Sequence, residues 1–193
     1  MLCSPFLRHS PIDEWGNKDG AFLLHQDVSV PLTRRSALLT AAGWPLLVAA
    51  GRKNATIDLD GRRISIDYDA LTLGTARFGR TLAPFGKVWR FGEEAPRITV
   101  NAYTLTVLFE LLPGSYSLFA IPHPDHWTLI PSTATSGRVY NPSKDVGRFD
   151  VPVKTLPAPI RQLTFTLTRQ VSNVARLNIS IDQALVSTDL KVL

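Results

Sequence analysis

The chain has 193 residues, of which 45% are hydrophobic and 19% are charged, and these proportions exclude a globally disordered protein. The length is typical of one domain with a tail. The single cysteine, Cys3, excludes a disulfide framework and a thiolate metal cluster, and the net charge of +5 is dispersed, so we expect no nucleic-acid binding.

Residues 1–50 are predicted to form a leader that ends in an export signal. Arg34 and Arg35 precede an uncharged run that ends in small residues at Ala50, which is the pattern of a signal peptide. The arginine pair resembles the twin-arginine export signal. We expect a periplasmic or secreted protein that contacts the membrane transiently, through this segment only. The alternatives are an uncleaved membrane anchor, for which the run is short, and, for residues 1–32, a start site assigned too far upstream.

The remainder, residues 51–193, is predicted to be one all-β domain. Asp60 and Gly61 lie between two β-prone runs, 55–59 and 62–68, and this pair predicts a two-residue hairpin turn. Residues 70–85 are predicted to be a loop, because they contain glycines and a proline. Residues 98–112 are apolar and suit two strands or one bent strand.

A second hairpin is predicted between residues 116–121 and 127–130, with Pro122 to His126 as its loop. A polar loop, 131–147, follows it. Four further strands are then expected at 151–153, 163–168, 175–181 and 185–190. Short strands with regularly spaced turns, and no amphipathic helix, predict an antiparallel β-sandwich of the jelly-roll or immunoglobulin-like kind.

Two stretches resemble a known family. Residues 84–92 read P-F-G-K-V-W-R-F-G and are similar to P-Y-G-K-V-W-R-x-G in the family called domain of unknown function 2911. Residues 113–128 are similar to its A-G-T-Y-S-L-F-x-I-P followed by W-T, and 140–146 and 151–159 match two shorter pieces. The resemblance covers about residues 64–186. It implies an exported β-sandwich and brings no established reaction or ligand.

The chain departs from the family pattern at two places. Residues 68–71 read Y-D-A-L where the family usually has Y-S-R-P, and residues 92–94 read G-E-E where it usually has G-A-N. If the arginine and the asparagine of the family serve one site, this protein has lost or rebuilt that site.

The candidate ligand-binding residues are Lys87, Trp89 and Arg90. In an extended segment, Lys87, Trp89 and Phe91 project to one face, and Val88 and Arg90 to the other. A tryptophan flanked by cations is suited to stacking on a sugar or to binding an anion. The alternative is that Trp89 belongs to the core, since aromatic side chains mostly supply buried area.

The candidate metal ligands are His123, Asp125 and His126, which lie in the loop of the second hairpin. Two imidazoles and a carboxylate within four residues could form part of a metal site. The alternative is a solvent-exposed polar turn.

No catalytic constellation is evident, since the chain has no G-x-S-x-G motif and no phosphate-binding glycine loop. Carboxylate pairs at Glu93 and Glu94 and at Asp67 and Asp69 are expected to be solvated surface. The favoured function is therefore a non-enzymatic, exported domain that uses no cofactor and binds a small molecule, a glycan or an envelope component. The alternative is a small periplasmic hydrolase or metal-assisted enzyme that uses the histidine loop.

Overall fold

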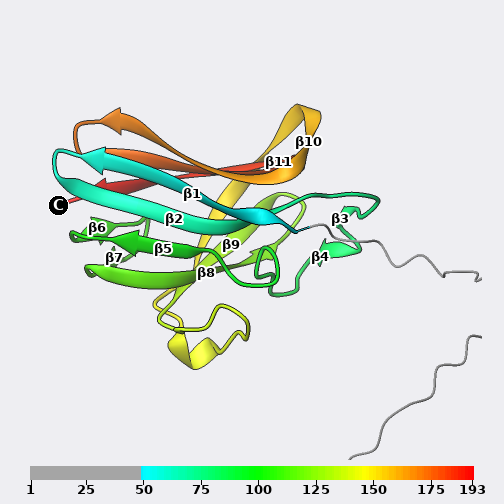
Figure 1. Ribbon diagram of the computed structural model, residues 1–193, viewed down its shortest axis with the longest axis horizontal. Coiled ribbons are helices and arrows are strands. Elements are labelled where there is room, and N and C mark those ends of the chain that lie inside the picture. The colour runs from blue at the N-terminus through cyan, green and yellow to red at the C-terminus, as the bar shows by residue number, and fades with distance from the viewer. Residues whose placement is uncertain (1–48) are drawn as a thin grey trace, which may run out of the picture. The chain divides into compact units, whose positions relative to one another are not determined.

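The structure is a computed structural model that describes residues 49–193, with side chains from Gly51 onward. Residues 1–48 of the predicted leader, with its arginine pair, lie outside the described residues, whereas its last two residues, Ala49 and Ala50, begin strand β1. Nine strands form one sheet in the order β1-β2-β5-β8-β9-β10-β11-β6-β7, with every neighbouring pair antiparallel, and β3 and β4 form a separate parallel pair. The predicted all-β class is therefore confirmed (Figure 1).

The elements have the following bounds: β1 (Ala49–Leu59), β2 (Arg62–Leu71), β3 (Phe78–Gly79), β4 (Leu82–Pro84), β5 (Arg97–Val100), β6 (Thr104–Leu105), β7 (Glu110–Leu111), β8 (Gly114–Pro122), β9 (His126–Ser132), the 3-10 helix η1 (Pro142–Lys144), β10 (Phe149–Val171) and β11 (Val174–Val192). In the part of the chain that the structure describes, no helix is long and apolar enough to cross a membrane.

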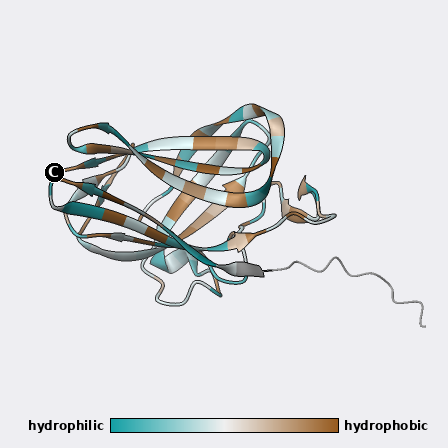
Figure 2. Cartoon of the chain, turned by 45° about the horizontal axis from the view of Figure 1, so that its top comes forward, coloured by the Kyte–Doolittle hydropathy of each residue, from teal (hydrophilic) through white to brown (hydrophobic). Residues whose placement is uncertain are grey.

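The first predicted hairpin is confirmed. Leu59 pairs with Arg62, and the two residues between them, Asp60 and Gly61, have φ values of 57° and 85°. Positive φ at both positions suits the twist of the flanking strands, and glycine adopts it without steric cost. Along β2 the buried residues alternate with partly exposed ones. Figure 2 shows that hydrophobic and hydrophilic residues alternate along the long strands.

The second hairpin is also confirmed, with a shorter loop than predicted. Pro122 pairs with Trp127, and His123 N–H donates to the carbonyl of His126 at 2.8 Å, so only residues 123–125 form the loop. Strand β9 then continues to Ser132.

The prediction of four further strands was wrong in number. The structure has two long strands instead, because the backbone stays extended through β10 and through β11. The predicted breaks are bends within these strands. In β10 the pairing with β11 shifts between Thr155 and Ile160, around Pro157 and Pro159, which have no N–H to donate. In β11 the bend is at Asp182, whose φ is 53°.

The two halves of β11 lie side by side after this bend. Arg176 Nε donates to Asp189 Oδ1 at 2.7 Å, and the Ser187 hydroxyl donates to Asn178 Oδ1 at 2.7 Å. Because these partners face each other across the same turn, β11 reverses direction around Asp182. Figure 1 shows its second half returning toward the C-terminus next to β6.

Three other predictions need smaller corrections. The apolar segment 98–112 holds parts of three short strands, β5, β6 and β7. The predicted loop 70–85 contains the end of β2 and the strands β3 and β4, and the loop 131–147 contains η1. These strands are two to four residues long, and such short pieces give no periodicity to recognise.

The sheet folds over so that β10 and β11 lie across from β1 and β2 (Figure 1). One large apolar cluster fills the space, with side chains from strands on both sides. Lys53 Nζ donates to Gln162 Oε1 at 2.7 Å and Arg169 donates to the carbonyl of Asp58 at 2.8 Å, so β1 and β10 are also joined by side chains. The largest fully buried side chains are Trp127, Phe91, Phe119 and Phe165.

Candidate functional site

Trp89 lies in the irregular segment between β4 and β5 and is fixed on β8. Its N–H donates to the carbonyl of Ala120 at 2.7 Å, and the N–H of Ala120 donates back at 3.0 Å. Only 7% of Trp89 is exposed. Its ring centroid lies 4.4 Å from that of Phe91, 5.5 Å from Phe78 and 5.7 Å from Trp127. Most of the indole therefore belongs to the core, and the rest borders a cavity.

Arg90 is exposed and shapes the backbone beside Trp89. Its Nε donates to the carbonyl of Gly92 at 2.9 Å, and its Nη1 donates to the carbonyl of Arg138 at 2.7 Å. The first bond closes the turn at Phe91, whose φ is 64°, and the second connects this turn to the segment after β9. Arg90 thus holds two segments together.

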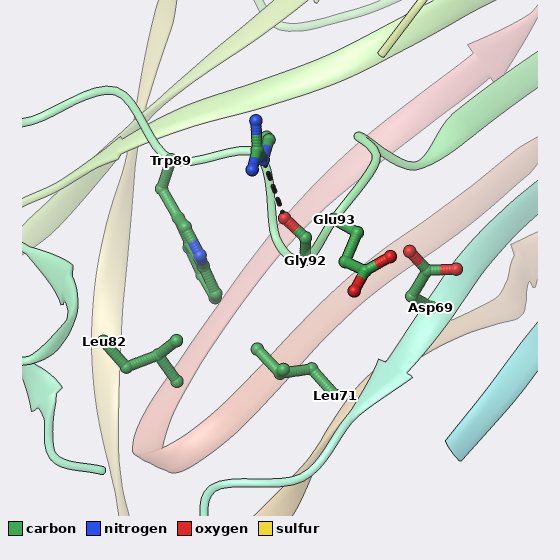
Figure 3. A pocket seen from close by; sticks show the side chains of 7 residues that line it. Asp69, Leu71, Leu82, Trp89, Gly92 and Glu93 are labelled. Carbon is green, nitrogen blue, oxygen red and sulfur yellow. Dashed lines mark hydrogen bonds between the residues drawn. The ribbon is translucent and has the colours of Figure 1, made fainter. Parts of the chain in front are cut away.

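A cavity of about 190 Å³ lies between this turn and the end of β2 (Figure 3). Leu71, Leu82 and Trp89 form its apolar side, whereas Asp69 and Glu93 lie next to each other at its other side. The lining residues are Asp69, Leu71, Leu82, Trp89, Arg90, Gly92 and Glu93.

Asp69 packs beside Gly92, the residue that follows the turn at Phe91. A Cβ atom at position 92 would lie 3.4 Å from both Cβ and Oδ2 of Asp69, which is ordinary contact distance. Neither Asp69 nor Glu93 forms an ion pair within residues 51–193, whereas the neighbouring Glu94 is paired with Arg52 at 3.0 Å. The cavity therefore combines an apolar wall with two carboxylates that form no ion pair and with one cation, Arg90.

A second cavity, of about 360 Å³, shares Leu82, Trp89, Arg90 and Gly92 with the first and extends toward Tyr140. The hydroxyl of Tyr140 donates to Asp145 Oδ2 at 2.7 Å and accepts from Arg148 Nη2 at 2.6 Å. Burial and the hydrogen bond to Asp145 both raise the pKa of Tyr140 above its ordinary value. The phenol of Tyr140 therefore stays neutral and hydrogen-bonded where it lines the second cavity.

Of the three predicted ligand-binding residues, the structure brings Trp89 and Arg90 to the first cavity and leaves Lys87 outside it. Lys87 is exposed, while Trp89 and Phe91 are buried. The predicted alternation fails to place Lys87 with Trp89 in the site because the segment forms only an isolated bridge at Trp89 rather than a strand. The expected pair of cations around the indole is therefore not formed.

The predicted metal ligands form a stacked turn. The rings of His123 and His126 lie 4.5 Å apart with an angle of 13° between their planes, and His126 Nδ1 lies 2.9 Å from Asp125 Oδ1. Ring nitrogens direct their lone pairs within the ring plane, so two stacked imidazoles do not converge on one ion. Over residues 51–193 no group of three or more His, Cys, Asp or Glu side chains could hold a metal. The predicted metal site is thus not supported.

Sequence reasoning missed the two carboxylates of the cavity, since it assigned Asp69 and Glu93 to solvated surface. A signal was present. Asp69 lies in the stretch 68–71 and Glu93 in the stretch 92–94, the two places where the chain departs from the family pattern, and both residues line one cavity.

Comparison with known proteins gives one match. The model of a family described as "Protein of unknown function (DUF2911)" matches residues 51–190. No curated protein and no solved structure gives a significant match.

Proposed function

Because the chain belongs to the DUF2911 family, we propose that it is an exported, non-enzymatic domain that binds a small, positively charged organic molecule in the cavity beside Trp89. The observation that carries the proposal is the pairing of Asp69 and Glu93 with an apolar wall. The two carboxylates form no ion pair and outnumber Arg90, the one cation that lines the cavity, so they attract an ammonium or guanidinium group more strongly than an anion. The apolar wall then contacts the carbon skeleton of the ligand.

The finer fold that we propose is a β-sandwich of the jelly-roll or immunoglobulin-like kind, formed by residues 51–193 after a leader of 50 residues. Its support is the pairing of β10, which begins beside β9 in one part of the sheet and continues beside β11 in the other. A shared apolar core between the two parts is the usual arrangement of such domains.

Binding is tested by titrating the protein with three small probes that differ in charge: butylammonium, glucose and butyrate. We expect saturable binding of butylammonium, observed by calorimetry and by shifts of the amide resonances of Asp69 and Glu93. Glu93→Gln should weaken it by about fivefold to tenfold, since it removes one charge from a short-range ion contact. Glu110→Gln, at an exposed position of strand β7, is the matched control and should change nothing.

If glucose binds and butylammonium does not, the site serves a saccharide, and the proposed cationic ligand is wrong. If none of the three probes shifts the resonances around Trp89, the cavity is not a binding site for small molecules.

Export is supported by Arg34, Arg35 and the uncharged run to Ala50. Cell fractionation and N-terminal sequencing should give a periplasmic or secreted protein that begins near Gly51. Replacing Arg34 and Arg35 by lysine should retain the protein in the cytoplasm, whereas the same change at Arg62 and Arg63, in β2, should not. A full-length protein in the cytoplasm at steady state would contradict export.

The alternative function is a hydrolase or metal-assisted enzyme that uses His123, Asp125 and His126. It predicts that purified protein contains metal by elemental analysis and loses it when both histidines are replaced by alanine. Since the stacked rings do not converge, we expect no change in melting temperature when zinc is added.

A further inference from the structure

The two cavities beside Trp89 adjoin, but their linings differ in charge. Leu82, Trp89, Arg90 and Gly92 line both cavities, so the cavities meet at the turn that contains Phe91. The first cavity has two carboxylates and one cation. In the second, both charged lining residues are arginines and none is acidic. The charge of the lining therefore changes from negative to positive across this turn.

Arg138 is the second of these arginines, and backbone contacts fix the position of its segment. Arg90 Nη1 donates to the carbonyl of Arg138 at 2.7 Å, and the N–H of Ala95 donates to the carbonyl of Gly137 at 2.9 Å. A Cβ atom at Gly137 would lie 2.7 Å from the nitrogen of Ala95, so this close approach requires glycine. The segment that carries Arg138 is thus held against the segment from Arg90 to Ala95.

Both arginines keep N–H groups available for a ligand. The side chain of Arg138 is exposed and forms no ion pair or hydrogen bond with any described residue. Arg90 forms no ion pair either, and its two hydrogen bonds to carbonyl groups use two of the roughly five N–H groups of a guanidinium. The nearby carboxylate of Asp145 is already paired with Arg148 at 2.9 Å. A ligand with only an ammonium group would therefore leave this positive end of the site without an acceptor.

We propose that the ligand is a small zwitterion, an amine that also carries a carboxylate. This inference rests on the proposed function and narrows its ligand. The ammonium group lies at Asp69 and Glu93, and the carboxylate accepts from Arg90 and Arg138. A guanidinium suits this role because its planar N–H groups match the two oxygens of a carboxylate. The apolar wall that both cavities share contacts the carbon chain between the two charges.

The charges of the site favour a zwitterion over a ligand with a single charge. An anion alone is repelled by the two carboxylates, and a cation alone is repelled by the two arginines. A zwitterion that spans the turn is attracted at both ends, so each end also selects against molecules that lack the matching charge.

The test compares three amino carboxylates with the amines that lack the carboxylate. The pairs are 3-aminopropanoate with ethylammonium, 5-aminopentanoate with butylammonium and 7-aminoheptanoate with hexylammonium, so that three separations of the two charges are covered. Calorimetry at about pH 7, where both end groups are charged, and at constant ionic strength gives the ratio of the two affinities in each pair. We expect a ratio of about ten for at least one chain length, as for the gain of a charge-assisted hydrogen bond.

Arg138→Gln should lower this ratio to about two, because only Arg90 then remains to bind the carboxylate. Arg161→Gln removes the same charge from an exposed position of β10 outside both cavities and should leave the ratio at about ten. Because the Arg138 side chain has no partner among the described residues, its replacement should leave the melting temperature unchanged, and a change in the ratio then reports on binding.

The possible outcomes separate this inference from the proposed function. If the amines bind and no amino carboxylate binds more tightly than its parent amine, the zwitterion is wrong and the proposed cationic ligand stands. If none of the amines binds, the proposed function itself is wrong, and this inference fails with it. Equal ratios in Arg138→Gln and Arg161→Gln would overturn the assignment of the carboxylate to Arg138.

Discussion

The ring of Trp89 lies 4.4 Å from the ring of Phe91, with an angle of 35° between the two planes. Phe91 is 1% exposed and has a φ of 64°, which bulky residues rarely adopt. The contact between the two rings is therefore made inside a turn whose backbone conformation is itself unfavourable, and core packing has to stabilise it.

Trp89→Ala should consequently lower the free energy of unfolding by about 3–5 kcal/mol, the usual effect of deleting a large aromatic side chain in a core. Val88→Ala is the control, since Val88 is 41% exposed and should change stability by less than about 0.5 kcal/mol. Chemical denaturation measures both. A Trp89→Ala protein as stable as the wild type would mean that Trp89 is not part of the core.

Arg90→Ala should be destabilising by about 1–2 kcal/mol, because it removes two hydrogen bonds to carbonyl groups that are exposed to solvent. Lys87→Ala removes the same charge from an exposed side chain and should have an effect of less than about 0.5 kcal/mol. Denaturant unfolding measures the stability of both variants. Equal stability would contradict the role of Arg90 in holding two segments together.

Gly61→Ala tests the first hairpin turn. Gly61 has a φ of 85°, and a Cβ atom added there would meet no other atom within 4 Å, so any loss of stability comes from the backbone alone. We expect a loss of about 1 kcal/mol, from the cost of left-handed backbone for alanine. Gly51→Ala also meets no atom within 4 Å and does not have this φ, and it should be neutral or slightly stabilising when both variants are unfolded by denaturant. Equal stability of the two variants would contradict the strain assigned to position 61.

Stability at alkaline pH should depend on Tyr140, since burial and the bond to Asp145 raise its pKa in the folded protein above its ordinary value. Below the pKa of the unfolded chain, Tyr140 is neutral in both states and the stabilisation is complete. As the pH rises through the folded pKa, the unfolded chain has already released its proton and the stabilisation is lost. Tyr140→Phe should therefore show a shallower loss of stability above about pH 10 than the wild type, measured by denaturant unfolding across this range. Identical slopes would contradict the prediction.

The hairpins were predictable from the sequence because local chemistry determines them. Asp60 and Gly61 specify their turn by backbone preference, and the alternation in β2 follows from one buried face. The cavity was not predictable, because Asp69 and Glu93 are brought together by the position of the irregular turn at Phe91. That turn depends on packing around Trp89 and on the hydrogen bonds of Arg90, and neither produces a periodic pattern in the sequence.

The continuity of β10 and β11 could not be predicted from the sequence either. The breaks expected near Pro157 and Asp182 are present as bends, but prolines and polar residues indicate only that regular pairing changes. Whether the chain then ends a strand or continues in a new direction depends on its partners, here β9 and β6 at distant positions.

The two edges of the sheet have a consequence for how the protein behaves at high concentration. An open strand edge is a template on which a second chain can add, and this is the first step of edge-to-edge polymerisation. At one edge, β7 offers only two residues. At the other, β1 is joined to β10 through Lys53, Arg169 and their hydrogen bonds, so a second chain would have to displace charged side chains before it could pair. An all-β protein with edges of this kind is protected from growing into fibrils by its own folded state.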